Sequence, residues 1–107
     1  MNKDQPSASS PSIEEAEIHF KNAWQHRKHK RYREAVEEFR KSLGHQPNHG
    51  ATHFNLGWVY DRLGEGEQAL VHVRKSLDLF EAGKQASNAD SARGLLSKLL
   101  KKYSDQA

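Results

Sequence analysis

Histidine has the widest chemistry of any residue in this chain, because its imidazole can bind a metal or move a proton near neutral pH. Among the seven histidines, His45, His49 and His53 recur every four residues, a spacing that can place metal ligands on one helix face. Pro47 interrupts any single helix through all three, so only His49 and His53 could share a face. With no cysteine and few carboxylates nearby, we expect packing and turn residues here and predict no metal site.

Catalytic groups form no recognisable pattern in the sequence. Serine, histidine and aspartate occur, but no motif pairs a nucleophile with a base, and no glycine-rich phosphate loop or metalloprotease helix is present. The absence of cysteine excludes disulfides, thiolate metal sites and cysteine nucleophiles. A chain of 107 residues has room for one domain with a modest core. We therefore predict a protein that is not an enzyme and that uses no cofactor.

A basic run, His26–Arg33, holds seven basic or titratable side chains in eight residues. This density could contact phosphates and would then make binding strongly dependent on salt. The formal net charge is only +3, and no nucleic-acid-binding motif accompanies the run. We favour a solvated turn whose cations suit the C-terminal end of the preceding helix. An acidic protein partner fits the run equally well, and a nucleic-acid-associated protein is the alternative.

Two aromatic pairs are the residues best suited to bind another molecule. Phe20 and Trp24 stand one helical turn apart, Phe54 and Trp58 do likewise, and 34 residues separate the pairs. Identities at this interval are His19/His53, Phe20/Phe54, Trp24/Trp58, Ala35/Ala69, Arg40/Arg74, Lys41/Lys75, Ser42/Ser76 and Leu43/Leu77. A repeat of this length is typical of paired helices that stack into a solenoid. We expect the phenylalanines in the core and the tryptophans on a shared surface.

Apolar residues at helical spacing predict five helices, and no stretch alternates apolar and polar residues as a strand would. The predicted helices span about 12–28, 32–43, 49–63, 67–82 and 88–103. Ser12 and Glu15 form a capping-box pattern at the first start. Gly44 and Gly64 are expected to end the second and third helices, where glycine takes a left-handed conformation at low cost. The last helix has an apolar and a basic face, which suits a helix that covers the end of a stack.

The domain organisation follows from these elements. Residues 1–11 are rich in serine and proline and are expected to form a disordered tail. One domain is predicted over 12–103, with repeats at about 16–49 and 50–83, a capping helix at about 88–103 and a flexible end at 104–107. The sequence has no apolar run long enough for a membrane span, and its start lacks the apolar segment of a secretory signal. We expect a cytoplasmic protein.

These features resemble the tetratricopeptide repeat family. The second repeat matches the family pattern at Leu56, Gly57, Tyr60, Gly64 and Ala69, and the first matches it at Ala23, Tyr32, Ala35, Phe39 and Pro47. The departures are His19 and His53 at the usual tryptophan site, Asn22 for leucine, His26 for tyrosine, Val73 for an aromatic and Glu81 for proline. The resemblance covers about 16–83. It implies an all-α fold, an antiparallel helix-pair solenoid of two helix-turn-helix repeats plus a terminal helix.

The resemblance also implies a protein-binding scaffold, adaptor or assembly factor that holds a peptide or helix in a concave groove. The implied groove residues are Glu17, Phe20, Trp24, Arg27, Lys28, Ala51, Phe54, Asn55, Trp58, Asp61 and Arg62. Some members of the family clamp a C-terminal carboxylate, and Asn55 matches one asparagine of that clamp. Phe20 and Trp24 stand where its lysine and its other asparagine would be, so the clamp is not expected here. The expected partner is an amphipathic or acidic segment of another protein, and a homodimer that buries the same aromatics is a further alternative.

Overall fold

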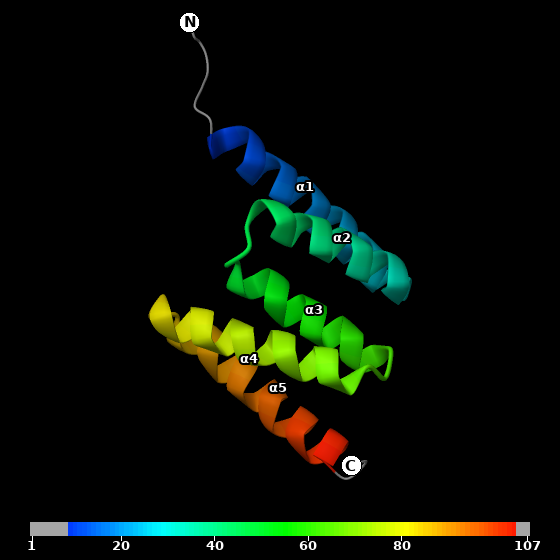
Figure 1. Ribbon diagram of the computed structural model, residues 1–107, viewed down its shortest axis with the longest axis vertical. Coiled ribbons are helices and arrows are strands. Elements are labelled where there is room, and N and C mark those ends of the chain that lie inside the picture. Colours follow the sequence, from blue (N-terminus) through cyan, green and yellow to red (C-terminus); the bar gives the residue numbers. More distant parts are fainter. Residues whose placement is uncertain (1–8, 105–107) are drawn as a thin grey trace, which may run out of the picture.

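The structure is a computed structural model, which describes the backbone of residues 9–104 and the side chains of residues 12–104. Five helices make up this part of the chain. They are α1 (Ser9–Lys28), α2 (Tyr32–His45), α3 (Gly50–Arg62), α4 (Gly66–Ala82) and α5 (Ala86–Ser104) (Figure 1). No strand occurs within residues 9–104, which confirms the all-α class. None of the described helices has an apolar stretch able to cross a lipid bilayer. Most of the predicted tail, residues 1–8, lies outside the described residues.

Two predicted helix boundaries are wrong. α1 begins at Ser9, so Ser12 lies inside the helix and does not cap it. Pro11 permits this earlier start, because the first N–H groups of a helix have no partner within it and proline loses no hydrogen bond there. α2 continues through Gly44, and the amide of Gln46 then donates to the carbonyl of Ser42 at 2.9 Å. Gly44 therefore does not take the left-handed cap.

Three turns of one kind join α1 to α2, α3 to α4 and α4 to α5. Each turn contains one residue with positive φ, namely Lys30 (63°), Gly64 (76°) and Lys84 (57°). In each, the amide of the next residue donates to a carbonyl five residues earlier, as from Glu65 to Tyr60 at 2.9 Å. These bonds satisfy carbonyls that the helix end leaves unpaired. Gly64 confirms its predicted role, whereas two of the turns place lysine where glycine would be less strained.

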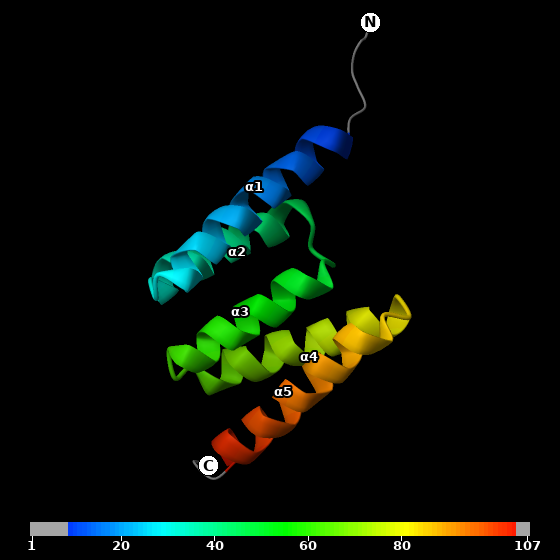
Figure 2. The same cartoon turned by 180° about the vertical axis from the view of Figure 1, so that it is seen from behind.

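The helices stack in antiparallel pairs into an elongated body. α1 packs on α2, α3 packs on α4, and α5 packs on α4. α2 and α4 are in front in Figure 1 and behind α1 and α5 in Figure 2, which is the reverse view. The radius of gyration is 15.2 Å, larger than the roughly 13 Å of a compact domain of about 100 residues. The structure thus confirms the predicted stack of helix pairs with a terminal helix.

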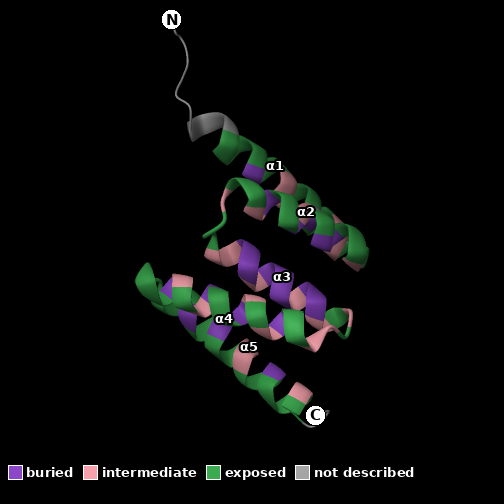
Figure 3. Ribbon diagram, in the orientation of Figure 1, coloured by how far each residue is buried: buried purple, intermediate pink, exposed green. Residues whose placement is uncertain are grey.

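The core is centred on α3, which is the most continuously buried helix (Figure 3). The main cluster combines alanines with larger apolar side chains from α1 to α5. Its members are Ala23, Ala35, Val36, Phe39, Leu56, Val59, Tyr60, Ala69, Val73 and Leu99. A second cluster, Phe80, Ala89 and Ala92, joins α4 to α5. α3 therefore holds both hairpins together, since it packs against α2 as well as α4.

Glycine permits close approaches between helices, and those at Gly57 and Gly66 join α3 to α4 and α4 to α5. A Cβ on Gly57 would lie 2.5 Å from Cγ2 of Val73 and 3.1 Å from the carbonyl oxygen of Ala69. A Cβ on Gly66 would lie 2.3 Å from the ring of Tyr103. The first contact sets the distance between α3 and α4, and the second seats the end of α5 on the start of α4.

Polar side chains also join the helices. The buried hydroxyl of Ser42 in α2 donates to the carbonyl of Ala16 in α1 at 2.8 Å. The ring of His72 stacks on those of His53 and Tyr60, with centroid distances of 5.2 and 5.6 Å. Nε2 of His53 donates to the carbonyl of Pro47 at 2.8 Å, which leaves its Nδ1 to accept from Nδ1 of His72 at 3.0 Å. A proton added to the acceptor nitrogen would break this second bond.

We expect Gly57→Ala to lower the free energy of unfolding by about 1–3 kcal/mol, because the added methyl group overpacks the contact between α3 and α4. Gly94→Ala is the matched control, because a Cβ at Gly94 meets nothing within 4 Å. Alanine is the better helix former, so the control should raise stability by about 0.5–1 kcal/mol. Urea denaturation of both variants measures the difference. Equal changes in the unfolding free energy of the two variants would contradict the close approach of α3 and α4 at Gly57.

We also expect stability to fall as the pH drops from about 6.5 towards 4. Burial is the main cause that lowers the pKa of His72 to about 4, and the nearby His53 and Arg40 act in the same direction. Burial lowers the pKa of His53 as well. In this window the unfolded chain binds more protons than the folded chain, so acid favours unfolding. Denaturation at several pH values gives the unfolding free energy as a function of pH. This free energy should depend less on pH in His72→Gln than in His29→Gln, a control in an exposed turn. The same pH dependence in both variants would contradict this cause.

Candidate functional site

The two tryptophans, on the first helices of the two repeats, both contact the same arginine. The guanidinium carbon of Arg27 lies 4.4 Å from the ring centroid of Trp24 in α1 and 3.7 Å from that of Trp58 in α3. Arg62 lies over the same Trp58 ring at 5.0 Å. A guanidinium within about 6 Å of an indole is attracted by the negative face of the ring. We call Trp24, Arg27, Trp58 and Arg62 the tryptophan–arginine stack.

The helices position this stack through their spacing and direction. Trp24 and Arg27 are three residues apart on α1, and Trp58 and Arg62 are four apart on α3, so each pair shares one helix face. α1 and α3 run in similar directions, which brings their C-terminal halves to one side of the molecule (Figure 1). Tyr32, at the start of α2, supports Trp58 edge-on with centroids 6.2 Å apart.

Asn55 fixes the inner end of the stack. Its side-chain oxygen accepts a hydrogen bond from Arg27, and its amide nitrogen donates to the carbonyl of Ala51 at 2.8 Å. The second bond sets the orientation of the amide, so the oxygen points towards α1. Asn55 is buried and serves here to hold an arginine.

Arg27 carries a positive charge that the described residues leave without a salt bridge. Among the described residues, its hydrogen-bond partner is the neutral Asn55, and no carboxylate pairs with it. Burial is the main cause that lowers the pKa of the guanidinium, although a group so basic stays charged at neutral pH. Trp24 is 41% exposed and Trp58 is partly buried. The stack therefore offers a fixed positive charge between two aromatic rings, one of them open to solvent.

The two phenylalanines do not join the tryptophans as a four-ring patch. Phe20 packs edge-on against Phe39 and His49, with centroids at 5.6 and 5.8 Å. Phe54 packs against the second core cluster, between α4 and α5. Both are half-buried, and each lines a hollow of its own.

Asp61 and Lys28, two other predicted groove residues, have different surroundings. The carboxylate of Asp61 accepts hydrogen bonds from Lys102 at 2.8 Å and from Tyr103 at 2.7 Å, both in α5. Burial alone would raise the pKa of Asp61, but these bonds outweigh burial and the pKa lies below its usual value. Asp61 thus ties α3 to α5, whereas Lys28 is exposed at the end of α1.

A hollow of about 250 Å³ between α3 and α5 continues the same face. Its lining is Ala51, Phe54, Asn55, Phe80, Asn88 and Ser91. Asn55 lines this hollow and also accepts the hydrogen bond from Arg27 of the tryptophan–arginine stack. Sequence reasoning missed Asn88 and Ser91 because it treated α5 as a cap alone. The sequence did hold the signal. α5 follows α4 as the first helix of a third repeat would, and its apolar side packs on α4.

The basic run divides among several surroundings. Arg27 joins the stack, Arg33 pairs with Glu65 at 2.6 Å, and Arg31 donates to His26 at 3.1 Å. The turn places Lys30 in the left-handed conformation described above. Of these three arginines, Arg33 alone pairs with a carboxylate among the described residues, and Lys28, His29 and Lys30 are exposed.

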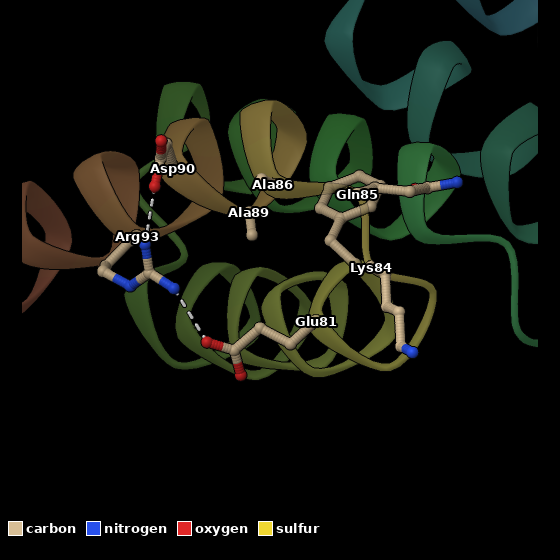
Figure 4. A pocket seen from close by; sticks show the side chains of 8 residues that line it. Glu81, Lys84, Gln85, Ala86, Ala89, Asp90 and Arg93 are labelled. Atoms are coloured by element: carbon tan, nitrogen blue, oxygen red, sulfur yellow. Dashed lines mark hydrogen bonds and ion pairs between the residues drawn. The ribbon is translucent and has the colours of Figure 1, made fainter.

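A second hollow, of about 330 Å³, lies at the turn between α4 and α5 (Figure 4). Arg93 occupies its wall and bonds to Glu81 and to Asp90, each at 2.8 Å. Two carboxylates thus neutralise the one arginine, and the arrangement fastens α5 to α4. We assign this hollow a structural role.

Comparisons with known proteins identify the fold. No protein-family model matches the sequence, and no curated protein matches it. The solution NMR structure of a tetratricopeptide repeat domain protein from Salinibacter ruber matches with a TM-score of 0.71 at 18% sequence identity. The match covers 78% of this chain and 85% of that chain. The described part of the chain therefore has the fold of a tetratricopeptide repeat domain, with two helix-turn-helix repeats followed by a fifth helix.

Proposed function

We propose that this protein is an interaction module, an adaptor or assembly factor, that binds an acidic amphipathic segment of another protein. The observation that carries the proposal is Arg27, held between Trp24 and Trp58 without a carboxylate partner among the described residues. A carboxylate of the partner would complete the electrostatics of this site. An apolar side chain of the partner would cover the exposed indole.

The rigidity of the stack supports this function. An arginine side chain normally loses conformational freedom when it binds, and this loss weakens binding. Here two rings and Asn55 already hold Arg27 in place. Tryptophan and arginine are also the residue types that contribute most to protein interfaces. The hollow beside Asn55 offers room for a neighbouring apolar residue of the same segment.

No described feature favours the nucleic-acid alternative to the same degree. Phosphate binding would need several free cations on one surface. The basic run instead distributes its arginines to the stack, to Glu65 and to His26. Self-association through Trp24 would use the same face, and the experiment below distinguishes it.

The sequence contains two tryptophans, and both lie in the stack, so intrinsic fluorescence reports on the proposed site. We expect a saturable change in emission with an amphipathic peptide that has leucines on one face and glutamates on the other. The same peptide with lysine in place of glutamate should give no such change. High salt should weaken the acidic peptide's binding, because screening reduces charge attraction.

Arg27→Gln should weaken this binding by more than about tenfold, which corresponds to a lost charge-assisted hydrogen bond of about 1.5–3 kcal/mol. Arg74→Gln, an exposed arginine on α4, is the matched control and should bind as the original chain does. Equal binding of both peptides would contradict the proposal. A change in emission with protein concentration alone would favour the homodimer.

Trp24→Ala should leave the fold intact, because the ring is 41% exposed and contributes mainly a cation–π contact. We expect a loss of about 1 kcal/mol in unfolding free energy. Phe39→Ala, at a fully buried ring, should cost about 3–5 kcal/mol. Thermal melts compare the two variants. Unfolding of the Trp24 variant would place that ring in the core and remove it from the site.

A further inference from the structure

We infer that His19, His45 and Glu15 form a binding site for a divalent transition-metal ion, with Zn²⁺ as the best fit. One ring nitrogen of each histidine and one carboxylate oxygen of Glu15 lie within 4.8 Å of one another. Glu15 and His19 are one turn apart on α1, and His45 is the last residue of α2. The site is separate from the tryptophan–arginine stack.

The side chains already face one another. The two imidazoles are stacked with centroids 6.0 Å apart and ring planes within 9°. Nε2 of His45 lies 3.6 Å from Oε1 of Glu15. Zinc–ligand bonds are about 2.0–2.2 Å long, so two ligands of one tetrahedral ion stand roughly 3–3.5 Å apart. The ligand atoms lie within 4.8 Å of one another, so metal binding requires the exposed side chains of Glu15 and His45 to rotate closer to His19.

A second carboxylate orients one of the ligands. Glu38 in α2 accepts a hydrogen bond from Nδ1 of His19 at 2.8 Å. This bond leaves Nε2 of His19 for the metal and makes the ring a better ligand, as carboxylates do behind zinc-bound histidines. Glu38 is only 17% exposed and is held in turn by Lys41. Such support is what separates a prepared site from side chains that meet by chance.

The donor set selects the class of metal. Two imidazoles and one carboxylate suit Zn²⁺ and related ions and leave a fourth position for water. Mg²⁺ and Ca²⁺ prefer oxygen ligands and should not bind here. An ion in this place would fasten α1 to the end of α2, beside the buried bond from Ser42 to Ala16.

The test uses the whole chain, freed of metal with a chelator and then titrated with Zn²⁺ by calorimetry. We expect one ion per chain, a higher melting temperature with Zn²⁺, and no response to Mg²⁺. His45→Ala and Glu15→Gln should each weaken binding by more than about tenfold, and Glu38→Gln by about 10–100-fold although it donates no ligand.

His29→Ala, at an exposed histidine outside the cluster, is the matched control and should leave the affinity unchanged. Circular dichroism checks that each variant keeps its helices, and His45 is exposed enough for its loss to be tolerated. The site would be overturned if Zn²⁺ bound the original chain no better than His45→Ala, or if His29→Ala lost affinity as strongly as the cluster variants.

Discussion

The close contact between α3 and α4 is the constraint on which the rest of the structure depends. Gly57 brings α3 against Val73 and Ala69, and α3 then packs its other side on α2. A helix buried on both sides has few positions open to it, because every shift creates a void or a clash. The C-terminal half of α3 is thereby fixed beside that of α1. Trp58 lies on this fixed helix, where the guanidinium of Arg27 reaches its ring.

The sequence predicted the helices and their pairing because both follow from local periodicity and from the 34-residue interval. It also placed Trp24 and Trp58 on a shared surface. It did not predict the arginine between them, since Arg27 has no counterpart at position 61, where the second repeat has Asp61. Asp61 instead binds Lys102 and Tyr103 in α5. Repetition predicts what two repeats share and says nothing about positions where each contacts a different neighbour.

The histidines show the same limit. The four-residue spacing allowed a shared face only for His49 and His53, since Pro47 separates them from His45. The structure instead stacks His45 on His19, from the preceding helix, and stacks His53 on His72, from the following one. These partners are 26 and 19 residues away, at no interval that helical periodicity would select. Such pairs depend on where two neighbouring helices come into contact, which the spacing within one helix does not reveal. The boundary at Gly44 was missed for a related reason, because packing of α2 on α1 extends that helix past its glycine.

The position of Arg27 has one further consequence, which concerns the angle between the two helix pairs. Its guanidinium joins α1 of one repeat to Trp58 and Asn55 of the next, so the proposed binding face is also part of the joint between the repeats. A partner that contacts Arg27 therefore acts on the angle between the two hairpins as well as on the surface. Such coupling is reciprocal. If a ligand favours one angle between the repeats, any other interaction that favours the same angle raises the affinity for that ligand. The proposed binding would thus link the superhelical twist of the domain to its occupancy through one side chain.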